Sequence, residues 1–174
     1  MSISDDDRRG IVTIRENPHA VYIPAFLPHD HNPVYRMSGG GTLNWTCTTD
    51  VTMPERTGWA PGAVGYGWDE FTRVFPSEGG VIYAIKPDGT LSWYRHDGFA
   101  DGSATWTGPA VVGRGWDQFT RVFAGAAGIV YAAKLDGTLL WFRHDGRRTG
   151  TFAWTGPRPV SRSWKFSIGG FEGR

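Results

Sequence analysis

The chain has 174 residues, a formal net charge of +1 and an aromatic content of 14%. This length suits one domain with a sizeable core, and we treat residues 1–174 as a single domain. The balanced charge gives no electrostatic case for binding nucleic acid or an anionic membrane. Because no apolar run reaches the ~18 residues of a membrane-spanning helix, we expect no membrane insertion.

The N-terminal sequence MSISDDDRRG has no apolar core and therefore does not resemble a secretory signal. We expect synthesis in the cytoplasm, with release by a non-classical route left open, and the compartment itself is not predicted. The chain holds one cysteine, Cys47, which has no partner for an internal disulfide. We interpret it as an incidental thiol.

A sequence repeat of 48 residues begins in residues 20–67, where the copy is degenerate. This copy keeps a tyrosine and a tryptophan of the pattern, Tyr35 and Trp45, which recur 48 positions later as Tyr83 and Trp93. It also keeps the Gly-Thr-Leu sequence that precedes the tryptophan.

The next two copies, residues 68–115 and 116–163, align without a gap, and 27 of the 48 aligned positions are identical. A repeat of this length indicates that one supersecondary unit is used several times. Trp164 opens a further copy, of which residues 164–174 supply only a partial closing strand.

Each full copy contains four short runs rich in β-branched and aromatic residues, which predict strands. In the first full copy the runs cover residues 71–75, 81–86, 90–96 and 104–112. Between the second and third runs, Asp88-Gly89 predicts a two-residue hairpin turn, because Gly supplies the positive φ of tight turns. Gly108-Pro109 interrupts the last run, which predicts an edge strand or a bend. Since no segment has a useful helical period, the chain is predicted to be all-β.

Four-stranded units at this spacing are typical of a β-propeller, in which each unit is one blade. A β-trefoil, which also has three copies of four strands, is the alternative; the consecutive hairpins favour the propeller. Propellers have about four blades or more, and this chain holds roughly three and a half copies. The ring would close through the N-terminal strand and the strand after Trp164, through a homo-oligomer that completes the propeller, or through further repeats of a longer array.

Each full copy opens with Gly-x-Gly-Trp-Asp-x-Phe-x-x-x-Phe, followed by a Gly and a Tyr-Ala pair. These residues are Gly67, Trp68, Asp69, Phe71, Phe75, Gly80, Tyr83 and Ala84, and then Gly115, Trp116, Asp117, Phe119, Phe123, Gly128, Tyr131 and Ala132. The pattern resembles the tachylectin-type repeat of five-bladed propeller lectins. The resemblance implies a lectin that binds N-acetylated sugars such as N-acetylglucosamine, one per blade, between neighbouring blades. It also implies that the protein needs no metal or other cofactor.

The chain departs from that family in two respects. The lectins carry five blades in one chain, more than this sequence holds. They also have acidic and amide residues where this chain has Ser103-Ala104-Thr105 before Trp106. The sugar specificity of the family is therefore not carried over.

The candidate ligand-binding residues at the repeat boundaries are Gly67, Trp68, Asp69, Gly115, Trp116 and Asp117. An aromatic face stacks on the apolar face of a pyranose, although the same tryptophans suit packing of one blade against the next. The aspartates would accept hydrogen bonds from sugar hydroxyls or an acetamide N–H, or else cap the loop by binding backbone N–H groups.

Trp93 and Trp141 complete the candidate ligand-binding residues. Each shares a strand face with an arginine two positions later, so a Trp–Arg stack across the outer sheet is the structural alternative. His96 and His144 occur once per repeat and would lie on different blades, where they cannot converge on one catalytic or metal site. We expect both to stabilise turns.

We predict no metal site and no enzymatic activity. His29-Asp30-His31 is the densest cluster of metal-ligand types, but it lies in a loop of the degenerate copy and is a weak signal. The sequence has no Gly-x-Ser-x-Gly elbow, phosphate-binding glycine loop or His-Glu-x-x-His motif. The repeat places its carboxylates at turns and boundaries rather than in the facing pairs that glycoside hydrolysis needs.

Two classes of function fit these features. The first is a multivalent lectin-like module for a glycan with an N-acetyl group, in which repetition offsets weak single-site affinity through avidity. The second is a propeller scaffold that binds protein or assembles with itself and has no sugar site.

Overall fold

The computed structural model describes residues 32–48, 62–162 and 164. Its strands are β1 (Asn32–Met37), β2 (Leu43–Thr48), β3 (Gly62–Gly65), β4 (Arg73–Pro76), β5 (Val81–Ile85), β6 (Leu91–His96), β7 (Trp106–Gly113), β8 (Arg121–Ala124), β9 (Ile129–Ala133), β10 (Leu139–His144) and β11 (Trp154–Ser161). Short 3-10 helices, η3 (Trp68–Glu70) and η4 (Trp116–Gln118), precede β4 and β8.

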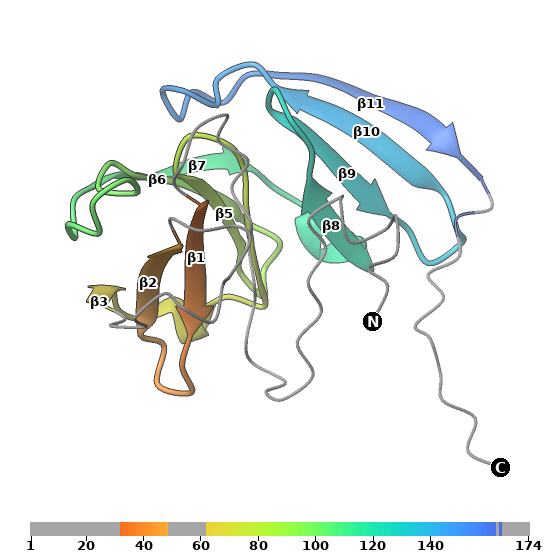
Figure 1. Cartoon of the computed structure of the whole chain (residues 1–174). Coiled ribbons are helices and arrows are strands. Elements are labelled where there is room, and N and C mark those ends of the chain that lie inside the picture. Colours follow the sequence, from red (N-terminus) through yellow and green to blue (C-terminus); the bar gives the residue numbers. More distant parts are fainter. Residues whose placement is uncertain (1–31, 49–61, 163, 165–174) are drawn as a thin grey trace, which may run out of the picture.

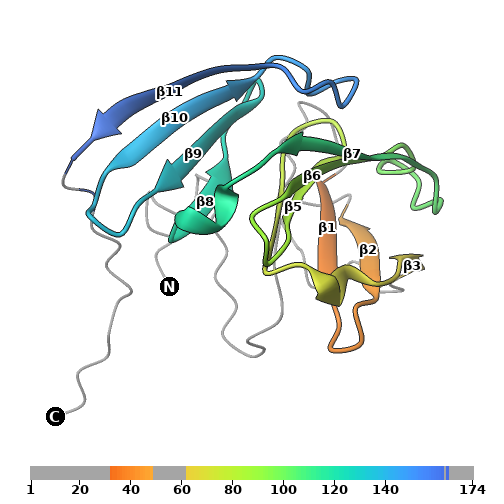
Figure 2. The same ribbon diagram turned by 180° about the vertical axis from the view of Figure 1, so that it is seen from behind.

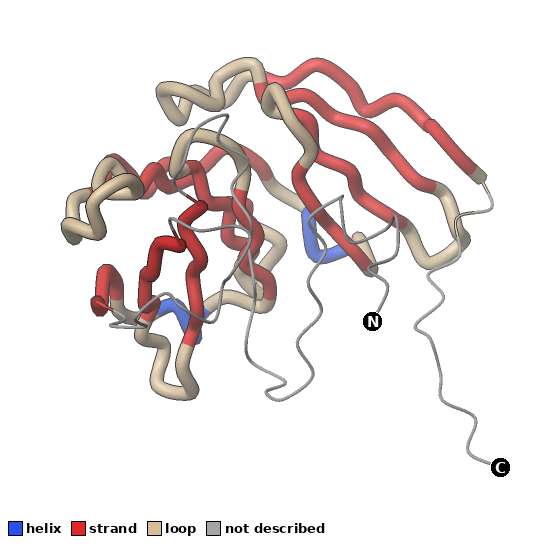
Figure 3. Tube along the Cα trace, viewed as in Figure 1, coloured by secondary structure: helices blue, strands red, loops and turns tan. Residues whose placement is uncertain are grey.

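Each repeat forms its own antiparallel sheet from consecutive strands, and the sheets lie side by side (Figure 1). The first sheet has the order β1-β2-β3, the second β4-β5-β6-β7 and the third β8-β9-β10-β11. Strands β4 and β8, which begin the second and third sheets, contact each other. The view from behind shows the same sequence of sheets, and strands account for nearly all the regular structure (Figures 2 and 3).

The four-stranded meanders of the second and third sheets, with their first strands β4 and β8 together, have the blade arrangement of a β-propeller. The predicted fold is therefore confirmed for the part of the chain that is described, and the β-trefoil alternative is wrong because each copy completes a sheet of its own. The degenerate copy supplies β1, β2 and β3.

The hairpin turn between β5 and β6 differs from the predicted two-residue type. Gly89 N–H donates to Lys86 O at 3.0 Å and Lys86 N–H donates to Thr90 O at 2.9 Å, so the loop has three residues. A two-residue turn with positive φ at both central residues would require one at Asp88, which does not have it. Gly89 alone adopts the left-handed conformation, with φ 79°.

Strand β7 is the outer edge of the second sheet, as its Gly-Pro break predicts. Its pairing with β6 has register shifts between Leu91 and Ser92 and between Trp93 and Arg95. The peptide bond Gly108–Pro109 is cis. Bulges and prolines interrupt the regular edge that would otherwise invite pairing with another strand.

Side chains from both faces of the second sheet pack against its neighbours. One face, with Tyr83, Leu91 and Trp93, lies against the third sheet, and all three side chains are at most 1% exposed. The other face, which includes Ile82 and Ala84, lies against the first sheet. A sheet with two buried apolar faces needs a neighbour on each side, which explains why its strands lack a simple alternation of polar and apolar residues.

A tyrosine–histidine hydrogen bond crosses each sheet junction. Tyr35 Oη lies 2.7 Å from His96 Nδ1, and Tyr83 Oη lies 2.8 Å from His144 Nδ1. The histidine Nε2 atoms lie 2.8 Å from the carbonyl oxygens of Ser103 and Thr151. Because a carbonyl can only accept, Nε2 carries the proton and Nδ1 accepts from the tyrosine. The histidines thus fix their own loops, as predicted, and also join neighbouring sheets, which was not predicted.

Indole N–H groups cross the same junctions. Trp45 Nε1 donates to Phe99 O at 3.0 Å and Trp93 Nε1 donates to Arg147 O at 2.8 Å. A tryptophan of the later sheet also donates to the earlier one, since Trp154 Nε1 of the third sheet donates to Val112 O of the second at 2.6 Å. The indole therefore contributes both buried area and a directional bond, which sets the distance between sheets.

Some sequence predictions lie outside the described residues. These are the His29-Asp30-His31 cluster and the partial closing strand after Trp164. The boundaries of a single domain over residues 1–174 stay a prediction.

Replacing Tyr83 with Phe should lower the free energy of unfolding by about 1–2 kcal/mol, because His144 Nδ1 then loses its partner in a buried site. Denaturant unfolding measures this, with Tyr66→Phe as the control because Tyr66 is 77% exposed. Equal, small effects of both substitutions would contradict the role of the hydroxyl.

Stability should fall as the pH is lowered from about 7.5 to about 5. Burial lowers the pKa of His96 and His144, so the folded state favours neutral imidazole and the unfolded state binds more protons. The stabilisation is present above the ordinary histidine pKa of about 6.5 and is lost below it. Denaturation midpoints across this range measure the slope, and His144→Gln should flatten it; an unchanged slope would argue against this assignment.

Candidate functional site

The boundary motif forms a tight turn followed by one turn of 3-10 helix. Gly67 and Gly115 precede η3 and η4 with φ values of 76° and 73°, a conformation that favours glycine. Both predicted glycines therefore have a backbone role. They direct the chain from the outer strand of one sheet to the first strand of the next.

The tryptophan of each boundary motif binds the preceding sheet through its backbone. Trp68 N–H donates to Gly41 O and Trp116 N–H donates to Gly89 O, both at 3.0 Å. The acceptor glycine lies in a hairpin turn of the preceding sheet. Gly41 lies between β1 and β2, and Gly89 lies between β5 and β6. Trp164 N–H donates to Gly137 O at 2.9 Å in the same manner.

The boundary tryptophan rings are buried in the sheet junctions. Trp68 and Trp116 are each 5% exposed. The centroid of the Trp116 ring lies 5.5 Å from that of Phe119, 5.1 Å from Phe142 and 5.4 Å from Trp154. These neighbours belong to the same repeat as Trp116, and the ring also shares a buried cluster with Leu91 and Val112 of the second sheet, so its main role in this structure is packing at the sheet junction.

The edge of each boundary indole keeps an unused donor. No hydrogen-bond partner for Nε1 of Trp68 or Trp116 is found among the described residues. The one fully buried side-chain nitrogen or oxygen without a partner in that part of the chain is Ser77 Oγ. The two indole nitrogens therefore retain some contact with solvent and can donate to a ligand.

The boundary aspartates lie against glycines of the preceding hairpin turn. A Cβ atom at Gly41 would overlap Asp69 Oδ1, and a Cβ atom at Gly89 would overlap Asp117 Oδ1. Only glycine at these turn positions lets the carboxylate approach the neighbouring sheet so closely. Each aspartate is thus placed at a junction of two sheets.

The aspartate carboxylates are exposed and do not cap the boundary turn. Neither 3-10 helix has a side-chain cap hydrogen bond. Asp69 and Asp117 have no hydrogen bond from any residue that the structure describes, and both are exposed. Their oxygens are therefore available as acceptors, and the loop-capping alternative considered from the sequence receives no support from this geometry.

The side chain that precedes each boundary glycine differs between the junctions. Tyr66 precedes Gly67 and is 77% exposed, whereas Arg114 stands at the corresponding position before Gly115. Gln118 Nε2 donates to Gly115 O at 2.6 Å and helps to hold the second turn. The two junctions share backbone geometry and a carboxylate but present different neighbouring groups.

Trp93 and Trp141, the other candidate ligand-binding residues, lie in different environments. Trp93 is 1% exposed beneath the third sheet, with the Arg95 guanidinium 6.0 Å from its ring centroid. Trp141 is partly exposed, and Arg158 rather than the expected Arg143 lies 5.7 Å from its ring. Trp93 therefore belongs to the core, and neither tryptophan lies beside the boundary aspartates.

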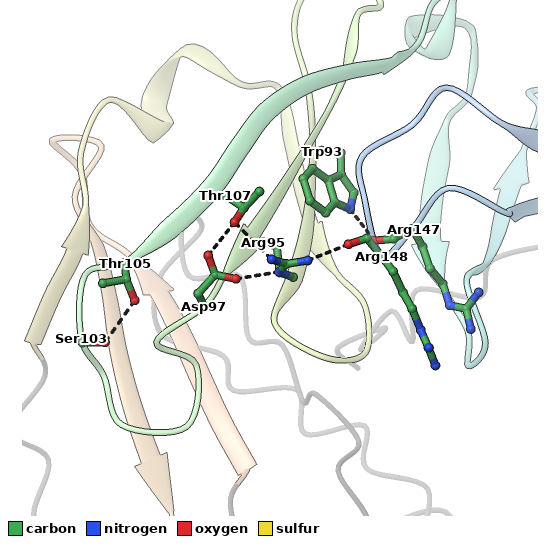
Figure 4. A network of polar contacts seen from close by, with 8 residues as sticks. All are labelled: Trp93, Arg95, Asp97, Ser103, Thr105, Thr107, Arg147 and Arg148. Atoms are coloured by element: carbon green, nitrogen blue, oxygen red, sulfur yellow. Dashed lines mark hydrogen bonds and ion pairs between the residues drawn. The ribbon is translucent and has the colours of Figure 1, made fainter.

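A polar network occupies the opposite end of the junction between the second and third sheets (Figure 4). Arg95 Nε donates to Asp97 and Arg95 Nη1 donates to Arg148 O, each at 2.6 Å. Thr107 Oγ1 donates to Asp97 Oδ2 at 2.6 Å. The Thr107 hydroxyl and then the Arg95 guanidinium lower the pKa of Asp97. Because these groups satisfy one another, the network joins strands β6 and β7 to the next sheet.

Sequence reasoning missed the tyrosines that pair with the histidines, Tyr35 and Tyr83. Both recur at one position of the repeat, and burial raises their pKa values far above the ordinary tyrosine range. The recurrence of the tyrosines is visible in the sequence. Each histidine partner lies 61 residues after its tyrosine, a separation that differs from the 48-residue repeat, so the repeat alone does not pair them.

No group of three or more potential metal ligands occurs in the described part of the chain. That part also has no helix long and apolar enough to cross a membrane.

Comparison with known families gives one match over most of the chain. The family model described as Tachylectin matches residues 26–168. Among curated proteins, none was found to match the chain.

Gly89→Ala should destabilise the fold by more than Gly137→Ala. Both glycines have positive φ, 79° and 82°, but only a Cβ at Gly89 overlaps a carboxylate; at Gly137 the nearest atom is an ordinary 3.4 Å away. Each substitution costs about 1 kcal/mol or more for backbone strain. Denaturant unfolding of both variants measures the difference.

The loss of unfolding free energy caused by Gly89→Ala should be smaller in a chain that also carries Asp117→Ala. A double-mutant cycle measures this difference. Purely additive effects would mean that the carboxylate does not lie against this turn.

Proposed function

The chain belongs to the Tachylectin family, a family of lectin-like propellers, and we propose on that premise that it binds N-acetylated glycans at its sheet junctions. The proposal places one site at the Gly41–Asp69 contact and one at the Gly89–Asp117 contact.

One observation carries the proposal. Each boundary motif brings an exposed carboxylate to a sheet junction and leaves it without a hydrogen bond from the described residues. The same motif leaves an indole Nε1 donor unused. A sugar presents hydroxyl donors, and an acetamido group adds an N–H donor and a carbonyl acceptor. The carboxylate suits the donors, and the indole N–H suits the carbonyl.

The buried rings change how a sugar would be held. Trp68 and Trp116 have no open ring face, so we do not assign them the pyranose stacking expected from the sequence. Tyr66 is a better stacking group at the first junction because it is exposed beside Gly67. Arg114 replaces it at the second junction, where it would donate hydrogen bonds instead. The proposed sites are therefore unequal in affinity.

Two sites on one chain would make the protein multivalent. A single sugar hydroxyl exchanges water for protein at little net gain, so each site is expected to be weak. Binding two glycan ends of one surface raises the apparent affinity through effective concentration. Association of several chains would add further sites, and we include a homo-oligomer in the proposal.

We propose further that the bound sugar is not chemically converted. The boundary carboxylates occur once per junction, whereas glycoside hydrolysis needs two that flank one bond. This agrees with the non-catalytic role expected of the family.

The scaffold alternative is supported by a different observation, an apolar face of the third sheet that no described sheet covers. Self-assembly and sugar binding use different surfaces, so the two functions are compatible.

Binding of N-acetylglucosamine should fall by about tenfold or more in the Asp69→Ala/Asp117→Ala variant, because a hydrogen bond to a charged acceptor contributes about 1.5–3 kcal/mol. Saturation-transfer NMR and titration calorimetry measure binding, and a glycan array identifies the preferred sugar. Asp145→Ala is the matched control, since that exposed carboxylate lies at the other end of the third sheet and is bonded to Arg143 and Thr155.

Thermal unfolding checks that the binding variants stay folded. Absence of glycan binding by the wild-type protein would overturn the proposal. Undiminished binding by the double variant would show that Asp69 and Asp117 do not contact the sugar. Tryptophan substitutions are less informative, because a buried Trp→Ala change costs about 3–5 kcal/mol of stability.

A further inference from the structure

The face of the third sheet that points away from the second has the same residues as faces that are buried elsewhere. Within the chain, the corresponding face of the first sheet packs on the second, and that of the second packs on the third. No sheet among the described residues covers the face of the third. We call it the open face, with Tyr131, Ala133, Leu139, Trp141 and Val160.

The open face is apolar, and although Ala133 and Leu139 are buried, its other three side chains are more exposed than their counterparts. Val160 is 55% exposed, whereas Val112 at the same repeat position is 0% exposed. Tyr131 and Trp141 are partly exposed, and their counterparts in the second sheet are fully buried. Contiguous apolar surface with these residues indicates an interaction site.

The open face has the same polar groups that, in the second sheet, form hydrogen bonds with the third sheet. The hydroxyl of Tyr131 stands where that of Tyr83 binds His144. Trp141 Nε1 stands where Trp93 Nε1 donates to the Arg147 carbonyl.

Arg143 Nη1 stands where Arg95 Nη1 donates to the Arg148 carbonyl. In the described part of the chain, these three groups of the third sheet have no hydrogen-bond partner. The face thus matches a surface that offers one acceptor for a hydroxyl and two backbone carbonyls; at the repeat position of His96 and His144 the first sheet has Thr48, whose hydroxyl can also accept.

From this continuity with the two junctions inside the chain, we propose that the open face binds the first sheet of a second copy of this protein. The first sheet also has a face that no described sheet covers, and it carries the partly buried Val34, the exposed Arg36 and the buried Thr46. In the repeat they correspond to Ile82, Ala84 and Tyr94 of the second sheet, whose side chains pack against the first sheet. The exposed guanidinium of Arg36 can lie on the aromatic rings of the open face.

The resulting contact is head to tail, since different faces of the two copies meet. Such contacts close into a ring or continue as a filament. The inference rests on the fold and not on sugar binding, so either can fail alone.

The experiment measures the mass of the full chain by light scattering and sedimentation velocity. The wild-type protein should associate to a multiple of the 19.2 kDa chain. Trp141→Glu and Arg36→Glu should each shift the mass to that of one chain, because Trp141→Glu places a charge in the apolar half of the contact and Arg36→Glu reverses the charge of the other half. Tyr131→Arg replaces Trp141→Glu if near-ultraviolet circular dichroism shows that the latter is not folded.

A mixture of Trp141→Glu and Arg36→Glu should form a dimer, because each variant keeps the half of the contact that the other lacks. Leu135→Glu is the control and should associate like the wild type, since Leu135 is 90% exposed in the β9–β10 turn. A monomeric wild type, an associated Trp141→Glu or Arg36→Glu variant, a mixture that stays monomeric, or a monomeric Leu135→Glu would each overturn the proposal.

Discussion

The second sheet of this protein is apolar on both faces, and the packing of one sheet on the next is the constraint from which the rest of the structure follows. Side chains such as Tyr83 and Trp93 are almost completely buried only because the third sheet covers them. The hydrogen bonds of Tyr83 with His144 and of Trp93 with Arg147 O then fix the separation and tilt of the sheets. Apolar area drives the contact, and directional bonds specify it.

The same packing explains where the candidate ligand-binding groups lie. The boundary turn must pass from one sheet to the next, so Trp116 binds the preceding hairpin through its backbone and buries its ring. Asp117 follows directly and is carried to the junction, where Gly89 leaves room for its carboxylate. The Trp116 ring therefore has the structural role, whereas the proposed sugar-binding groups are its Nε1–H and the carboxylate of the adjacent Asp117.

Among the described residues, the first and third sheets each have a face that no sheet covers. An uncovered face of a repeat unit needs polar residues or a neighbour. The first sheet has Arg36 at the position of Ala84, whereas the third sheet keeps Tyr131 and Trp141 at the positions of Tyr83 and Trp93. The proposed contact between copies would cover both faces.

The 48-residue recurrence, the strands and the edge position of β7 could be predicted from the sequence, because they depend on local patterns of β-branched, aromatic, glycine and proline residues. The tertiary structure decided which recurring residues are buried and which are free. Trp68 was a candidate for stacking on a sugar, yet its ring is covered by Tyr94 and Trp106 from later in the chain. Asp69 was equally suited to capping, yet it has no such bond. Burial and hydrogen bonding depend on residues far along the chain, in the same sheet and in its neighbours, and their positions are a property of packing that no local pattern contains.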